Sequence, residues 1–317
     1  MIDDLLAGHR TIVHAHLKPV VGSTLQPTGF PNLGAAEFTR PGQPPSLLVE
    51  SVQSLTNHLE NTMWDEAERR PIEIIAELPW VKVESSGGEH LTSSREEPHR
   101  LSSAYIREAT VQGQPGTAWL IERLGLRDKR PLDRRAIAAA VFDLDPMCLV
   151  HGVFFSEKGF HGNPKFRRVM HAVIEARDVS PVISGGVKRD DVAFEADKPT
   201  GRSAEAGYGF IPFARTEYTA ADILLSAALD LAQLRSYGLD PERTRVLGLL
   251  ALLELSFLLS APLRLRTACD LRVDDVEVAS PEAATLPNAD ELSEALRESV
   301  ARLDRDGDVP VIAVWDK

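Results

Sequence analysis

The longest apolar run of the chain is VLGLLALLELSFLLSAPL, at residues 246–263. Its length is about the minimum that spans a membrane, but Glu254 interrupts it and Pro262 ends it. A helix that is apolar on nearly all sides is more often buried in the core of a large soluble protein. We therefore expect a buried core helix here and not a membrane span.

The composition is that of an ordinary globular protein, because 43% of the 317 residues are apolar and 26% are charged. Cys148 and Cys269 form neither a disulfide framework nor a metal-binding motif. The N-terminus, MIDDLLAGHR, carries acids where a signal peptide needs basic residues. Together these features favour a protein of the reducing cytoplasm that makes no membrane contact.

The charges are unevenly distributed along the chain, whose net charge is −12. Residues 274–308 hold eleven acids against three arginines, and so supply −8 of that total. Residues 155–189 hold seven Lys or Arg against three acids, and 123–135 hold six against two. The acidic C-terminal region can face solvent or a partner while a basic face elsewhere binds phosphates, so the net charge does not exclude nucleic acid.

The predicted elements alternate between strands and helices without a short repeat, which indicates one α+β domain over residues 1–317. The expected strands are at 10–21, 148–156, 263–273 and 309–315. Helices are expected after an N-cap at Ser51, at the end of 158–179, at 219–239 with Thr219 as N-cap, at 246–260 and at 288–304. The polar segments 84–99 and 184–209 are interpreted as long irregular insertions.

The stretch ISGGVKRDDV, residues 183–192, allows two interpretations. Gly185 and Gly186 before Lys188 and Arg189 suit backbone contact with a nucleic-acid strand as well as an ordinary turn. Asp190 and Asp191 are adjacent, and neighbours on an extended segment point to opposite faces, so they favour an exposed turn over a metal-dependent catalytic pair. Walker, GxSxG, HExxH and zinc-spacing motifs are all absent, and His14 with His16 lacks a third metal ligand nearby.

Two further segments offer groups that suit phosphate. The helix start after Ser51 presents Gln53, Ser54 and Asn57 near the positive end of the helix dipole, although the polar face of an amphipathic helix explains these residues equally well. On the predicted strand 263–273, the side chains of Arg264, Arg266 and Arg272 fall on one face together with Asp270. An anion-binding row and a solvated arginine ladder explain this strand equally well.

The ordered motifs LQPTGFPNLG, LVESVQSLTNHLE, PHRLSSAYI, HGVFFS, ISGGVKRDDV, GYGFIPFARTEYTA and LRLRTACDL resemble the backbone subunit of the type I-G (formerly type I-U) Cascade complex. This subunit is the seventh Cas family, which belongs to the RAMP superfamily. The resemblance covers about residues 10–273. It implies an RRM-like (ferredoxin-like) α+β core with insertions that form palm, fingers and thumb. It also implies a non-catalytic subunit that needs no cofactor or metal.

The resemblance further implies that copies polymerise along a CRISPR guide RNA and present it for pairing with target DNA. The other expected partners are further Cascade subunits and a separate helicase-nuclease. Either insertion, 84–99 or 190–207, is a possible thumb. An alternative is a metal-dependent ribonuclease that cuts target RNA with Asp190 or Asp191. The expected RNA contacts are Lys18, Ser51, Gln53, Ser54, Asn57, His99, Arg100, Lys165, Arg167, Arg168, Gly185, Gly186, Lys188, Arg189, Arg264 and Arg266.

Overall fold

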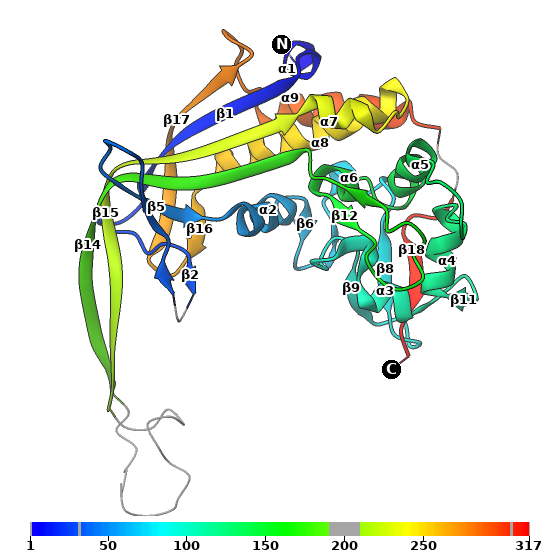
Figure 1. The fold of residues 1–317 in the computed structure, drawn as a ribbon, viewed down its shortest axis with the longest axis horizontal. Coiled ribbons are helices and arrows are strands. Elements are labelled where there is room, and N and C mark those ends of the chain that lie inside the picture. The colour runs from blue at the N-terminus through cyan, green and yellow to red at the C-terminus, as the bar shows by residue number, and fades with distance from the viewer. Residues whose placement is uncertain (1, 31–32, 190–209, 305–306, 317) are drawn as a thin grey trace, which may run out of the picture.

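A seven-stranded sheet forms the body of the protein in this computed structural model, which describes residues 2–30, 33–189, 210–304 and 307–316 (Figure 1). The strands run in the order β16 (Leu263–Arg266), β17 (Cys269–Ser280), β1 (Arg10–Pro19), β15 (Phe210–Asp230), β14 (Met170–Arg189), β5 (Pro45–Glu50) and β4 (Glu37–Thr39). Every neighbouring pair is antiparallel. The mixture of helices and sheets confirms the expected α+β class.

The four central strands follow the order β17-β1-β15-β14. In the chain, helix α2 (Val52–Asn61) lies between β1 and β14, and α7 (Leu231–Ser236) with α8 (Pro241–Ser260) lies between β15 and β17. Among the described elements, β15 is the next one after β14. Apart from the other elements inserted between β1 and β14, this is a β-α-β-β-α-β order, with short extra strands at the edges of the sheet.

The core lies on one face of this sheet. On β1, Val13, Ala15 and Leu17 are buried while His14 and His16 are only partly covered, as period-two alternation requires. Leu55 and Leu59 of α2 and ten apolar residues of α8 belong to the same core. The predicted core helix 246–260 is thus confirmed within α8, which begins with Asp240 as N-cap and Pro241 in its first turn. Among the described residues, no helix is long and apolar enough to cross a membrane.

A second, five-stranded sheet has the order β11 (Gln114–Pro115), β10 (Thr110–Val111), β18 (Val311–Val314), β8 (Val81–Glu84) and β9 (His90–Ser93). It lies with α3 (Ala104–Glu108), α4 (Gly116–Arg123), α5 (Arg134–Leu144) and α6 (Met147–His151) at the opposite end of the molecule from β5 (Figure 1). The remaining helices are α1 (Ile2–Ala7) and α9 (Ala289–Ala301), the latter packed on α8. Three strand pairs complete the fold: β2 (Gly29–Phe30) with β3 (Gly34–Ala35), β6 (Trp64–Asp65) with β7 (Arg70–Pro71), and β12 (Val153–Phe154) with β13 (Lys165–Phe166).

The longest elements correct two predicted helices. Met170–Arg189 and Phe210–Asp230 are the strands β14 and β15, so the helices expected after residue 165 and from Thr219 are wrong. Only Leu231–Ser236 of the second prediction is helical. Beyond the part where β14 and β15 pair with β5 and β1, the two strands pair with each other and project from the body (Figure 1). We call residues 181–189 and 210–217 the arm.

Three smaller predictions also need correction. Residues 84–99 are not an irregular insertion, because β8 and β9 form a hairpin in the five-stranded sheet and Ser93 and Ser94 are buried. Residues 148–156 are not one strand but the end of α6, a glycine and β12. Residues 263–273 are two paired strands, so Arg264 and Arg266 lie on β16 while Arg272 lies on β17.

Candidate nucleic-acid interface

A pocket of about 520 Å³ gathers five of the predicted contacts: His99, Arg100, Lys165, Arg167 and Arg168. They come from the start of the 3-10 helix Arg100–Ser102 and the residue before it, from β13, and from the segment between β13 and β14. The other lining residues are Pro98, His151, Gly152, Val153, Phe154, Ser156 and Phe166. No acid is present among the described residues that line the pocket, although the chain as a whole is strongly acidic.

The wall of the pocket is the pair β12 and β13. Phe154 lies opposite Lys165, and the Lys165 Nζ atom sits 5.1 Å from the centroid of the Phe154 ring. Gly152, just before β12, has φ of +86°. A Cβ atom there would lie 2.9 Å from both the Arg168 amide nitrogen and the Phe166 carbonyl oxygen, so only glycine allows this close approach.

Arg100 is held by a buried ion pair. Its Nε and Nη2 atoms donate to the two Glu60 carboxylate oxygens at 2.7 and 2.9 Å, and its Nη1 atom donates to the Gly152 carbonyl oxygen at 2.9 Å. Both side chains are only 12% exposed. Burial alone would lower the pKa of Arg100, but the Glu60 carboxylate more than offsets this and raises it. Arg100 therefore forms part of the pocket lining, but its positive charge is already balanced by the Glu60 carboxylate.

In the part of the chain that the structure describes, no acid forms an ion pair with the cations at the mouth of the pocket. Lys165 and Arg167 are exposed. Arg168 is half-buried and donates to Thr56 Oγ1 at 3.1 Å and to the Val52 carbonyl oxygen at 3.4 Å, both in the first turns of α2. Burial, and next the nearby Arg100, lower the pKa of Arg168. An anion at this mouth would be favourable for all three cations.

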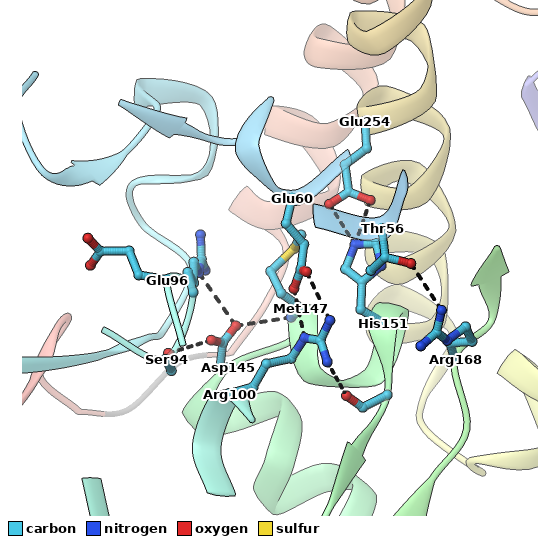
Figure 2. Close-up of polar contacts among 12 residues, drawn as sticks. Thr56, Glu60, Ser94, Glu96, Arg100, Asp145, Met147, His151, Arg168 and Glu254 are labelled. Carbon is cyan, nitrogen blue, oxygen red and sulfur yellow. Dashed lines mark hydrogen bonds and ion pairs between the residues drawn. The ribbon is translucent and has the colours of Figure 1, made fainter. Parts of the chain in front are cut away.

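The floor of the pocket contains a second buried pair, between His151 and Glu254 (Figure 2). The His151 Nε2 atom lies 2.9 Å from each Glu254 carboxylate oxygen, and both side chains are 0% exposed. Burial raises the pKa of Glu254, and His151 opposes that rise. This pair explains how a carboxyl is accommodated in the middle of the apolar helix α8.

Helix α2 adjoins the pocket through Arg168, and it carries four more predicted contacts. Ser51 is the N-cap, as predicted, and its hydroxyl accepts from the Ser54 amide at 3.2 Å. Gln53 and Asn57 are exposed, while Ser51 and Ser54 are half-buried. The start of α2 therefore presents amide side chains to solvent beside the basic pocket.

Arg264 and Arg266 line a second pocket, of about 410 Å³, together with Arg215, Glu217 and Asp270. Arg266 contacts the buried Glu50 carboxylate and donates to the Gln26 carbonyl oxygen at 3.0 Å. Arg264 lies opposite Asp270 on β17, and Arg215 pairs with Glu217 at 2.7 Å. Because an acid accompanies each arginine, this cluster is closer to a paired ladder than to a phosphate site.

Gly185, Gly186 and Lys188 lie on the arm, apart from both pockets. They belong to strand β14, so the glycines do not form the loop that the sequence suggested. The Phe213 ring packs on Gly186, where a Cβ atom would lie 3.2 Å from it. Lys188 is exposed, and Arg189 ends the strand. Asp190 and Asp191 lie outside the described residues.

Lys18 is separated from the other candidates. By the alternation of β1 it faces away from the core, and its Nζ atom pairs with Asp274 at 2.6 Å. That hydrogen bond lowers the pKa of Asp274. Near it, His16 Nδ1 lies 2.9 Å from Asp222 and His14 Nδ1 lies 3.0 Å from the Ser226 hydroxyl. The described part of the chain holds no group of three or more metal-ligating side chains.

A family model described as CRISPR-associated protein GSU0053 (Cas_GSU0053) matches residues 11–181, more than half of the chain. The chain belongs to this CRISPR-associated family. The matched segment includes α2, β12, β13 and every residue that lines the basic pocket. No curated protein matches the chain.

Two solved structures resemble this family member at low identity. A chain of a "CRISPR RNA-guided surveillance complex, pre-nicking" is 14% identical, with a TM-score of 0.45, and the match covers 94% of this chain and 82% of that one. Csc2 of Thermofilum pendens is 12% identical, with a TM-score of 0.33, and the match covers 95% and 79%. At these scores neither likeness assigns a role to any residue of the CRISPR-associated chain.

Sequence reasoning missed three residues of this site in the family member. Phe154 and His151 lie in HGVFFS, which the motif series contains but whose side chains carried no predicted role. Glu254 was visible only as an interruption of the apolar run. A carboxyl in a helix that is apolar on all sides needs a buried partner. The position of Glu254 in the apolar run is therefore the one signal in the sequence that pointed toward a partner such as His151.

Proposed function

We propose that this CRISPR-associated chain is a non-catalytic, guide-RNA-binding backbone subunit of a Cascade surveillance complex of type I-G. In this proposal several copies follow one guide RNA and present it for pairing with target DNA. Other Cascade subunits and a separate helicase-nuclease complete the assembly. Family membership supports the CRISPR context, whereas the type of the complex, the guide RNA and the assembly of several copies are what the motif resemblance implies.

The observation that carries the proposal is the acid-free basic pocket beside α2. In a chain of net charge −12, Lys165, Arg167 and Arg168 surround one opening without a lining acid in the described residues. Contacts of this kind, from cations, amides and a helix start, hold a phosphate–sugar chain without reading its sequence. A guide-binding subunit needs this property, because base pairing by the guide reads the target.

The strand order supports an RRM-like, ferredoxin-like core. In that motif a β-α-β-β-α-β chain forms a sheet with its fourth, first, third and second strands side by side. Here β17, β1, β15 and β14 follow this order, with α2 and α7–α8 as the two connecting helices. We assign this sheet with α2 to the palm. The arm is the better candidate for the thumb, because 84–99 is folded into the five-stranded sheet.

The test is the binding of a single-stranded RNA at several salt concentrations. A Lys165→Ala/Arg167→Ala variant should bind RNA of any sequence more weakly than the wild type. Its logarithmic salt slope should fall by about 1.4, since each phosphate contact to a single strand contributes roughly 0.7. The matched control is Arg297→Ala/Arg302→Ala on α9, whose two arginines are exposed away from the pocket. Equal slopes for the three proteins would contradict the proposal.

The absence of catalysis is a separate part of the proposal and has its own experiment. The assembled complex is incubated with Mg²⁺ and an RNA complementary to its guide. The target RNA should stay intact. Regular cleavage that disappears in Asp190→Ala or Asp191→Ala would replace this part of the proposal with a ribonuclease function.

A further inference from the structure

The Arg168 side chain is tied to helix α2 at the mouth of the basic pocket. Its Nη1 atom donates to the Thr56 hydroxyl at 3.1 Å (Figure 2). The same atom also donates to the Val52 carbonyl oxygen at 3.4 Å. Because both contacts use Nη1, they do not occupy the Nε and Nη2 groups. The guanidinium can therefore rest on α2 and still offer donors to a phosphate.

The Thr56 hydroxyl has a fixed orientation. Thr56 is only 2% exposed, and its hydroxyl donates to the Val52 carbonyl oxygen at 2.7 Å. A hydroxyl has one proton and two lone pairs, so its lone pairs remain for the Arg168 guanidinium. The buried hydroxyl is thus an acceptor that α2 holds in place for this cation.

The backbone beside Arg168 is held as well. The Val169 amide donates to the Val150 carbonyl oxygen at 2.9 Å, and the Val169 carbonyl oxygen accepts from the Asp230 amide at 2.7 Å. Gly152 packs so closely that a Cβ atom there would lie 2.9 Å from the Arg168 amide nitrogen. Arg168 is therefore fixed both at its backbone and at its guanidinium.

This position is unfavourable for a cation on its own. Burial lowers the pKa of Arg168, the nearby Arg100 lowers it further, and the Glu60 carboxylate offsets these effects only in part. A long cationic side chain that is free to move places its charge in water. The hydrogen bond to Thr56 opposes that movement. A cation held in a partly desolvated site beside a like charge is prepared for an anion, which offsets both costs.

We propose that Thr56 is a positioning residue for RNA binding, whose hydroxyl holds the Arg168 guanidinium where it meets a phosphate. The inference rests on the proposed RNA-binding function, and it adds a residue that does not touch the RNA. Ordering a flexible side chain during binding costs affinity, and Arg168 is ordered beforehand. Loss of the Thr56 hydroxyl therefore weakens RNA binding without removing a phosphate contact.

The test is a double-mutant cycle of Thr56→Val and Arg168→Ala, read as affinity for a single-stranded RNA at several salt concentrations. Valine is close to threonine in size and lacks the hydroxyl. Thr56→Val should bind about two- to tenfold more weakly, the range that ordering one side chain costs, with the wild-type salt slope. Arg168→Ala should lower the logarithmic slope by about 0.7, one phosphate contact. In the Arg168→Ala background, Thr56→Val should cause no further loss of affinity.

Two further variants complete the experiment. Thr56→Ser keeps a hydroxyl and should bind RNA like the wild type. Thr62→Val is the matched control at the C-terminal end of α2, because the Thr62 hydroxyl donates to the Leu59 carbonyl oxygen at 2.7 Å. It should also bind RNA like the wild type.

Two results would overturn this inference alone. One is an unchanged affinity in Thr56→Val. The other is an equal loss from Thr56→Val in both backgrounds, which would mean that the hydroxyl acts through the packing of α2. Either result leaves the proposed function standing as long as the salt slope still depends on Lys165 and Arg167. A wild type that binds no RNA overturns both.

Discussion

Buried charged side chains are concentrated beneath the basic pocket. Glu60 of α2 pairs with Arg100, Glu254 of α8 pairs with His151, and Asp145 lies 3.5 Å from Arg95 Nε and 2.5 Å from the Ser94 hydroxyl (Figure 2). Each pair joins elements that are distant in the sequence. Desolvation makes such pairs a weak source of stability, but breaking one leaves a buried charge without a partner. Their effect is therefore to fix how these elements meet.

The Glu60–Arg100 pair leads to a prediction about stability. Glu60→Ala should lower the free energy of unfolding by about 3–5 kcal/mol, because Arg100 stays buried without its carboxylate. Urea denaturation measures this change. Asp3→Ala removes the exposed partner of Arg245 and should cost less than about 1 kcal/mol. Equal losses in the two variants would show that the Arg100 site reaches solvent after all.

Glu254 should make stability depend on pH. Its pKa in the folded protein is raised above the ordinary value of 4.5 by burial. The unfolded chain therefore loses this proton at a lower pH than the folded protein. The contribution of Glu254 to the free energy of unfolding is fully present below about pH 4.5, and it is lost as the pH rises through the pKa of Glu254 in the folded protein. Relative to Glu254→Gln, the wild type should become progressively less stable above pH 4.5. Urea unfolding of both proteins from pH 4 to 7 measures the difference, and a constant difference would contradict the prediction.

At the scale of elements, strand β15 shows why local sequence patterns predicted a helix wrongly. Residues 219–235, TAADILLSAALDLAQLR, are rich in alanine and leucine, which favour helices. In the structure Ile223, Leu225, Ala227 and Leu229 alternate into the core, because β15 lies between β1 and β14 at the centre of the sheet. Such long-range pairing outweighs local propensity. By contrast, α8 and the Ser51 cap depend on adjacent residues, and both were predicted correctly.

For the candidate site, too, the sequence predicted some features correctly and missed those that depend on residues far apart in the chain. Motif resemblance predicted His99, Arg100, Lys165, Arg167 and Arg168, which the structure brings together in one pocket. It could not predict that Glu60 already neutralises Arg100, or that Arg266 contacts Glu50, because these partners are distant in the sequence. Nor could it identify Lys18 as a residue of the opposite sheet face. Residue type was readable from the sequence, whereas the partner of each charge was not.

The arm carries a prediction of its own. A two-stranded ribbon is marginally stable alone, and Phe213 covers Gly186 across the pair. Phe213→Ala should lower the local opening free energy of residues 182–188 by up to about 1 kcal/mol. Hydrogen exchange of those amides measures this change, and the midpoint of global unfolding should not move. An unchanged exchange rate would show that the ring does not hold the ribbon together.

For the whole molecule, the acid-rich C-terminal region and the basic pocket are built from different elements. Seven of the eleven acids of 274–308 lie on β17 and α9, whereas the basic pocket is lined by residues of β12, of β13 and of the segments beside them. Separation of this kind lets an acidic chain bind RNA on one side while its acids repel RNA from another. In the proposed function this arrangement would also orient each copy on a strand, with the basic pocket toward the phosphates.

Copies that share one orientation along an RNA should add one by one as the RNA lengthens. We expect the mass of the complex to rise in steps of one 34.8 kDa chain when the protein is mixed with single-stranded RNAs of increasing length. Mass photometry or sedimentation measures the steps. The Lys165→Ala/Arg167→Ala variant should need more protein to reach each step, because each copy loses two cations at the pocket. A protein-only scaffold would instead give one oligomer size at every RNA length, and that outcome would exclude assembly directed by RNA.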